Sequence, residues 1–186
     1  MEFFILYALL ASPYINKVCH NAKFEYQVLK NHGITLRAFE DTKIAAYLLG
    51  HLSTRLKDLS AQVLGVEQLQ LTDVLKGRTT SELTPEEWLP YAAADADMTL
   101  RLWRELEPAL RSEELLSLYR DFEIPLVPIL ADAERRGVML NTAALDHYAS
   151  QLYERIAALE EQLHTMLGAI NLRSGPQKKK VLFGDF

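Results

Sequence analysis

Two residues near the middle of the chain have types and spacing suited to phosphodiester chemistry. Tyr91 and Asp95 are four positions apart in a stretch of strong helix formers, so a helix would place a phenol and a carboxylate on one face. A metal-dependent phosphodiesterase needs carboxylate oxygens as ligands and a polar group that orients the attacking water. The alternative is a solvated carboxylate beside a rim aromatic residue, and the spacing alone does not decide between them.

The first hundred residues alternate between helical and extended patterns. Asp41-Thr42 before an apolar-periodic run predicts an N-capped helix, and Thr84-Pro85-Glu86-Glu87 is a capping box that predicts a helix start. The helix formers that follow predict a helix over 91–106 that stops at Pro108. Earlier runs predict three helices and two strands, namely helices over 3–11, 21–31 and 57–64, and strands over 15–19 and 36–39. This order is typical of an α/β domain with a mixed sheet flanked by helices.

The pattern changes after Pro108. Helices are predicted over 113–136 and 142–167, and the second carries an apolar seam that repeats at spacings of three and four. Because a short Arg-Gly-Val-Met turn joins them, we expect a long antiparallel helical hairpin. The domains are then 1–108 and 109–186.

The whole-chain properties narrow the class of protein. The 186 residues have a formal net charge of −5 and 49% hydrophobic residues, as in a soluble globular protein. The single cysteine, Cys19, excludes an intramolecular disulfide, and the five histidines show no metal-ligand spacing. No stretch reaches the length of a membrane span, so we expect a cytoplasmic protein without a membrane partner.

Several motifs occur together in a characteristic order. Lys17-Val-Cys-His-Asn-Ala-Lys-Phe-Glu25 is followed by Phe39-Glu-Asp-Thr42 and then by Tyr91-Ala-Ala-Ala-Asp95-Ala-Asp97. Downstream come Phe122-Glu-Ile-Pro-Leu-Val-Pro-Ile-Leu130, Glu134-Arg-Arg-Gly-Val138 and Asn171-Leu-Arg-Ser174. From about residue 10 onward the chain resembles family A DNA polymerases of the DNA polymerase I type. The matching segments are the back half of the 3′ to 5′ proofreading exonuclease domain and the start of the polymerase thumb.

This resemblance implies a partial ribonuclease H-like exonuclease fold acting in DNA replication and repair. It implies hydrolysis of DNA 3′ ends with two Mg²⁺ or Mn²⁺ ions, with Asp95 and Glu25 as metal ligands and Tyr91 holding the attacking water. It also implies contacts to a single-stranded 3′ end or a primer-template duplex, and union with the rest of a polymerase polypeptide. The expected nucleic-acid-binding residues are Asn21, Lys23, Arg173, Ser174, Lys178 and Lys179. For Lys178 and Lys179, a solvated lysine run without a DNA contact is an equal alternative.

Two departures from the family pattern bear on activity. No Asp-x-Glu motif occurs before residue 17, and this motif supplies two of the family's main metal ligands. Glu25 also stands where the family has Asp, which displaces its carboxylate by about a bond length. We therefore do not expect catalysis by this chain alone, which also lacks the palm and fingers of a polymerase. A non-catalytic DNA-binding scaffold and a ribonuclease D-like RNA exonuclease remain alternatives.

Overall fold

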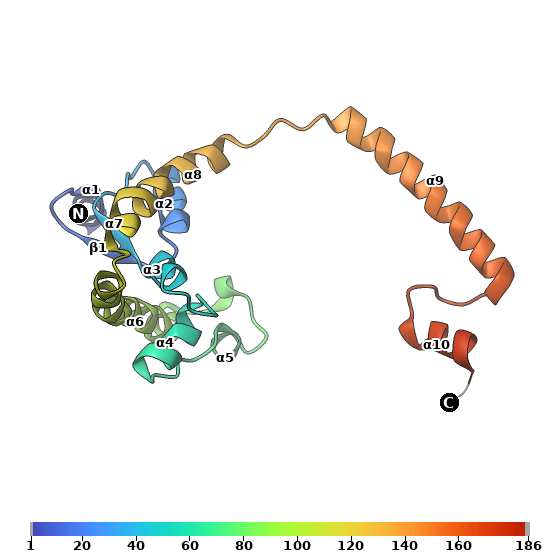
Figure 1. Ribbon diagram of the computed structural model, residues 1–186, viewed down its shortest axis with the longest axis horizontal. Coiled ribbons are helices and arrows are strands. Elements are labelled where there is room, and N and C mark those ends of the chain that lie inside the picture. The colour runs from blue at the N-terminus through green and yellow to red at the C-terminus, as the bar shows by residue number, and fades with distance from the viewer. Residues whose placement is uncertain (1, 185–186) are drawn as a thin grey trace. The chain divides into compact units, whose positions relative to one another are not determined.

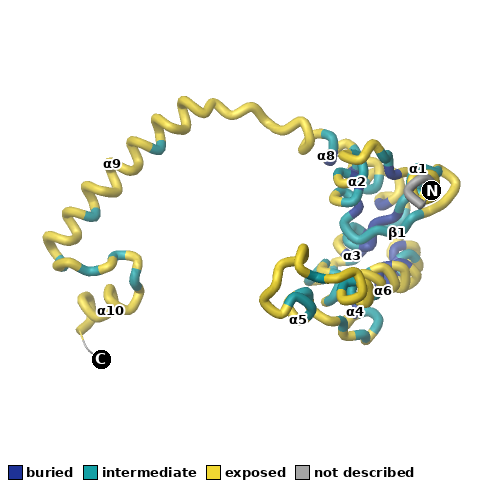
Figure 2. Tube along the Cα trace, turned by 180° about the vertical axis from the view of Figure 1, so that it is seen from behind, coloured by how far each residue is buried: buried dark blue, intermediate teal, exposed yellow. Residues whose placement is uncertain are grey.

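The computed structural model describes residues 2–184, apart from the side chains of residues 2–4. The chain divides into two compact units, Met1–Gly137 and Val138–Phe186 (Figure 1). All of the buried residues in the described part lie in the first unit (Figure 2). No helix in the described part is long and apolar enough to cross a membrane.

A short β-α-β unit organises the first unit. After helix α1 (Glu2–Ala11), strand β1 (Lys17–Cys19), helix α2 (Ala22–Asn31) and strand β2 (Phe39–Asp41) follow in order. The two strands pair in parallel, with Val18 opposite Glu40, because α2 returns the chain to the same end of the sheet. The predicted mixed sheet is not what the structure shows, because within residues 2–184 the sheet consists of two strands that run parallel to each other.

Two clusters of buried side chains cover the two faces of this sheet. On one face Val18 packs against a core that includes Ala45, Leu59, Leu102 and Trp103. These residues come from α3 (Thr42–Leu48), α4 (Leu56–Leu64) and α6 (Pro85–Ser112). Between α4 and α6 lie the short helix α5 (Leu71–Leu75) and a 3₁₀ turn, η1 (Thr80–Glu82).

The opposite face is covered partly by residues from beyond α6. Here Cys19 and Phe39 pack against Tyr26, Leu36 and Ala131. Ala131 belongs to α8 (Ile124–Arg136), which follows α7 (Leu116–Leu118) and a π-helical turn, η2 (Tyr119–Glu123). Val18 and Cys19 belong to different clusters because neighbouring residues of a strand face opposite sides of the sheet.

The helix starts agree with the local sequence signals, and one predicted stop does not. Asp41 caps α3, and Thr84 with Glu87 forms the capping box that opens α6. The predicted stop at Pro108 is wrong, because α6 continues to Ser112. Proline costs an interior helix about 3 kcal/mol. The burial of Leu106 and Leu110 on either side of it supplies a compensating gain of similar size.

The second unit contains α9 (Thr142–Leu167) and α10 (Gly175–Phe183). The predicted bounds of α9 are confirmed, whereas α10 was not predicted. None of α9 is buried, and the residues of the predicted seam are all exposed: Leu145, Tyr148, Leu152, Ile156, Leu159, Leu163 and Met166. The expected antiparallel hairpin is not confirmed, because α8 and α9 belong to different units. The units divide after Gly137, and the domain boundary near residue 108 stays a prediction.

Candidate functional site

Helix α6 brings Tyr91 and Asp95 together as their spacing predicted. Burial raises the pKa of the Tyr91 phenol, and the charge and hydrogen bonding of the Asp95 carboxylate raise it further. Asp95 lines two cavities, one of about 420 Å³ and one of about 40 Å³. Its Oδ1 atom is buried and has no hydrogen-bond partner.

Glu25 enters the larger cavity from α2. It lines this cavity together with Cys19, His20 and Asp95, so the two acidic residues singled out from the sequence share one pocket. Its Oε2 atom is buried without a hydrogen-bond partner. Burial raises the pKa of the Glu25 carboxyl to about 7, and the nearby negative charge of Asp41 adds to this shift.

Lys57, on α4, reaches the Asp95 carboxylate. Its Nζ lies 3.9 Å from Asp95 Oδ1 and 4.1 Å from the centre of the Tyr91 ring. The ammonium also donates a hydrogen bond to the carbonyl oxygen of Leu69. Only 16% of the Lys57 side chain is exposed, so this cation is held inside the site.

The donor set can be compared with what a two-metal site requires. The free oxygens of Glu25 and Asp95 are hard ligands of the kind that Mg²⁺ prefers. Over residues 2–184, however, no group of three or more His, Cys, Asp or Glu side chains lies close enough to hold a metal ion. Lys57 adds a positive charge against one of the two carboxylates. The described residues therefore do not fit a two-metal centre.

Asp41 caps α3 as predicted and has a second structural role, at the start of α2, that the sequence motif did not reveal. Its Oδ1 accepts hydrogen bonds from the backbone N–H groups of Asn21, Lys43 and Ile44, and its Oδ2 accepts one from Ala22 N–H. A single carboxylate thereby fixes the starts of both α2 and α3. Asn21 adopts a left-handed conformation (φ 85°) at this junction, which asparagine tolerates better than most residues.

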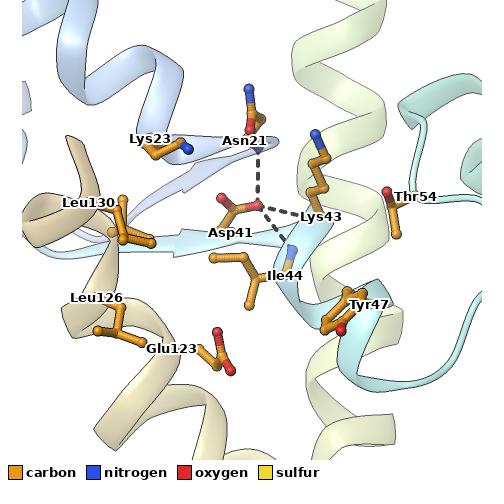
Figure 3. Close-up of a pocket in the computed structure, with 11 residues that line it drawn as sticks. Asn21, Lys23, Asp41, Lys43, Ile44, Tyr47, Thr54, Glu123, Leu126 and Leu130 are labelled. Atoms are coloured by element: carbon orange, nitrogen blue, oxygen red, sulfur yellow. Dashed lines mark hydrogen bonds between the residues drawn. The ribbon is translucent and has the colours of Figure 1, made fainter. Parts of the chain in front are cut away.

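A third cavity, of about 290 Å³, is lined by residues of this junction, including Asn21, Asp41 and Lys43. Figure 3 shows Lys23, Asn21 and Lys43 along one rim, with the apolar side chains of Leu126 and Leu130 forming a wall. The Asn21 side-chain amide points away from Asp41, and Asn21 donates to that carboxylate only through its backbone N–H. This cavity thus combines cationic and amide groups with an apolar surface.

Lys23 is not free to bind a phosphate without a rearrangement. Its Nζ lies 2.5 Å from Glu134 Oε1, and Gln27 donates to the other oxygen of the same carboxylate at 2.7 Å. These contacts lower the pKa of Glu134. They fasten α2 to α8, so Lys23 joins two helices of the first unit.

The remaining predicted DNA-binding residues lie in the second unit. Ser174 is the N-cap of α10 and accepts a hydrogen bond from Gln177 N–H. Arg173 is exposed just before it, and Lys178 and Lys179 are exposed on α10. The lysine run is therefore helical.

Three residues of the site region were missed. His20 lies in the Glu25 cavity with its Nδ1 2.8 Å from Thr42 Oγ1, and burial lowers its pKa. Tyr119 is fully buried, and its hydroxyl contacts the Asp41 backbone. Lys57 gave no signal beyond a position in an apolar-periodic helix. The adjacency of His20 to the Asn21 motif could have identified the histidine, but nothing local identifies the other two.

Comparison with known proteins adds a family assignment. A family model described as 3′-5′ exonuclease matches residues 2–111. DNA polymerase I of Rhizobium leguminosarum is 36% identical over 186 residues, which cover 96% of this chain and 18% of that protein. DNA polymerase I of Chloroflexus aurantiacus is 38% identical over 183 residues, which cover 94% of this chain and 19% of that protein. The chain spans about a fifth of the length of the curated relatives it matches.

Two solved structures are also similar. The POL domain of Pol1 from M. smegmatis, in complex with DNA primer-template and dNTP, matches with a TM-score of 0.72 and 28% identity. That match covers 98% of this chain and 30% of the other. A nuclease in its apo form matches with a TM-score of 0.61 and 27% identity, over 71% of this chain and 64% of the other.

Proposed function

This chain belongs to the 3′-5′ exonuclease family of DNA polymerase I, and from that membership we propose that it binds the 3′ end of single-stranded DNA. The observation that carries the proposal is the shared pocket of Glu25 and Asp95, in which each carboxylate keeps a buried oxygen without a hydrogen-bond partner. Tyr91 stands beside Asp95 on the same helix. The corresponding process is the replication and repair of DNA, in the cytoplasm, by a polymerase of which this chain is a segment.

The two segments 1–108 and 109–186 have different roles in this proposal. Residues 1–108 are the C-terminal part of a ribonuclease H-like exonuclease domain, and residues 109–186 are the start of the polymerase domain with its thumb helices. Lys178 and Lys179, with Arg173 and Ser174, hold duplex phosphates without reading sequence, which suits their exposure on and beside α10. Asn21 acts at the single-stranded 3′ end from the rim of the cavity in Figure 3, and Lys23 does so once its ion pair with Glu134 opens.

We assign binding to this chain and not hydrolysis. A complete exonuclease domain of this family uses divalent metal ions, Mg²⁺ or Mn²⁺, in a two-metal mechanism. Glu25 and Asp95 are two ligands for such a centre, and the described residues do not assemble a third. Bond cleavage therefore requires further ligands.

Photo-crosslinking of a single-stranded DNA with a 3′-terminal 4-thiothymidine tests this proposal. We expect weak binding, with a dissociation constant of roughly 1–100 μM at physiological salt. Mass spectrometry should place the crosslinks on peptides that line the Glu25 and Asp95 pocket. The same oligonucleotide with the photo-reactive base at its 5′ end is the positional control.

Matched variants separate the site from general charge effects. Asp95→Ala should alter the crosslinking yield, whereas Asp97→Ala should not, because Asp97 faces away and pairs with Arg101 at 2.8 Å. Crosslinks confined to the second unit would contradict binding at the pocket. Binding of an RNA of the same sequence more than tenfold tighter than the DNA would favour the ribonuclease interpretation instead.

A further inference from the structure

Asp95 lines one cavity with Glu25 and another with the cation of Lys57. The larger cavity contains Asp95 and Glu25, whereas the smaller one contains Asp95, Tyr91 and Lys57. Asp95 is therefore a lining residue of both cavities. One space holds its acidic neighbour and the other holds a positive charge.

The position of Lys57 is defined by three contacts, two from α6 and one from Leu69. Its ammonium faces the Tyr91 ring at 4.1 Å, lies 3.9 Å from Asp95 Oδ1, and donates to the Leu69 carbonyl. An aromatic face and a carbonyl oxygen both stabilise a cation that has left bulk water. Lys57 is thus held in the site and does not swing freely in solvent.

The contact between Lys57 and Asp95 is electrostatic and is not a hydrogen bond. A separation of 3.9 Å exceeds hydrogen-bonding distance, and Asp95 Oδ1 indeed has no hydrogen-bond partner. The ammonium offsets part of the carboxylate's charge, while Oδ1 stays buried without a hydrogen-bond partner. A metal ion that bound this oxygen would be repelled by the ammonium 3.9 Å away.

We propose that Lys57 is a built-in counter-ion of Asp95 that competes with divalent metal ions for this carboxylate. A divalent cation binds Asp95 tightly only when the Lys57 ammonium moves away from it. This inference rests on the proposed function and deepens it, since it concerns the same pocket and names a group that opposes cation binding there. In the described residues, Lys57 supplies to Asp95 part of the positive charge that metal ions would supply in a complete site.

Binding of Mn²⁺ to the purified chain, followed by the electron paramagnetic resonance signal of the free ion, tests the proposal without any reaction. We expect Lys57→Met to bind Mn²⁺ at least tenfold more tightly than the unaltered chain. Methionine keeps an apolar stem against the Tyr91 ring and removes the charge. Lys57→Arg keeps the charge and should bind Mn²⁺ as weakly as the unaltered chain.

Two further variants locate the effect. The higher Mn²⁺ affinity of Lys57→Met should disappear when Asp95→Asn is added, because the carboxylate that the metal ion binds is then lost. Lys76→Met removes one exposed lysine elsewhere and should leave the Mn²⁺ affinity within twofold. Equal affinities of Lys57→Met and the unaltered chain, or a gain that survives Asp95→Asn, would overturn the proposal.

A structural role of Lys57 alone predicts a different result. Loss of the Leu69 contact would then lower the melting temperature while the Mn²⁺ affinity stayed constant. If Lys57→Met does not fold, Lys57→Gln retains a donor for Leu69 and provides the same comparison. Failure of DNA crosslinking would sink the proposed function and would leave the Mn²⁺ titration interpretable by itself.

Discussion

At the scale of single residues, the site is defined by groups whose charges are only partly satisfied. Glu25 is half-buried and its Oε2 atom is buried without a hydrogen-bond partner, while Asp95 is balanced by Lys57 without a hydrogen bond to it. Asp41 is the contrasting case, since four backbone N–H groups satisfy its carboxylate. Carboxylates of one small region therefore divide into a structural one and two that are available to a ligand.

The raised pKa of Glu25 makes stability depend on pH. The folded value of about 7 lies above the ordinary value of 4.5, so the folded state favours the protonated carboxyl. The resulting stabilisation is fully present below pH 4.5 and is lost as the pH rises through 7. We expect Glu25→Gln to be more stable than the unaltered chain at pH 8, by on the order of 1–2 kcal/mol after solvent screening is allowed for.

Urea unfolding at pH 4.5 and at pH 8 measures this effect. The difference between Glu25→Gln and the unaltered chain should be small at the lower pH and largest at the higher. A difference that does not change with pH would contradict a Glu25 pKa near 7. Glu67→Gln, which changes a glutamate outside the pocket, is the control.

The Asp41 carboxylate should contribute strongly to stability. Asp41→Ala leaves the first N–H groups of α2 and α3 without their acceptor, and we expect a loss of about 3 kcal/mol or more. Asp58→Ala, at an exposed aspartate that accepts from Ser53, should cost less than about 1 kcal/mol. Thermal unfolding of both variants measures these losses of stability. Equal losses would contradict a larger contribution of Asp41 from capping two helices.

At the scale of elements, local signals predicted the helix starts and failed where distant contacts decide. Asp41 and Thr84 could be identified because a cap acts within three residues of itself. Pro108 misled because the burial of Leu106 and Leu110 outweighs a local helix breaker. Lys57 and Tyr119 could not be predicted, since their partners lie 38 and 78 positions away and only the folded chain brings them close.

The π-helical turn is joined to the sheet through one hydroxyl group. Asp41 N–H donates to Tyr119 Oη at 2.6 Å, and the hydroxyl donates back to the Asp41 carbonyl oxygen at 3.3 Å. Tyr119→Phe keeps the ring against Trp103 and leaves a buried N–H without an acceptor. We expect a destabilisation of about 1–2 kcal/mol in chemical unfolding. Tyr47→Phe, with a side chain that is 71% exposed, should change stability by less than about 0.5 kcal/mol.

At the scale of the whole molecule, burial is confined to the first unit of the described chain. The sequence led to a boundary near residue 108, since the composition and helix pattern change there. Tyr119, Val127 and Ala131 nevertheless lie in the core of the first unit. A sequence pattern marks the ends of elements but does not show which elements pack together, so it could not place these residues.

Truncation and limited proteolysis test the autonomy of this unit. We expect residues 1–137 to unfold cooperatively as a separate polypeptide, and residues 1–108 to lose cooperative unfolding because Tyr119 and Ala131 are then missing from the core. In the full chain, proteases should cut within 138–141, where every residue is exposed and none is helical. Amide hydrogen exchange should be slower in β1 and β2 than in α9. Stronger protection of α9 would contradict the burial pattern.

The Tyr119 hydroxyl also bears on how this chain meets other chains. A residue in a strand points its N–H and its carbonyl oxygen to the same side, so Tyr119 occupies the outer edge of β2 at Asp41. Exposed strand edges are the usual templates for edge-to-edge aggregation. With its last residue occupied, β2 is a poor surface for that process, and a strand added to this sheet meets no such obstacle from Tyr119 at β1. The tyrosine thereby occupies one position on the outer edge of β2, in addition to its contact within the core.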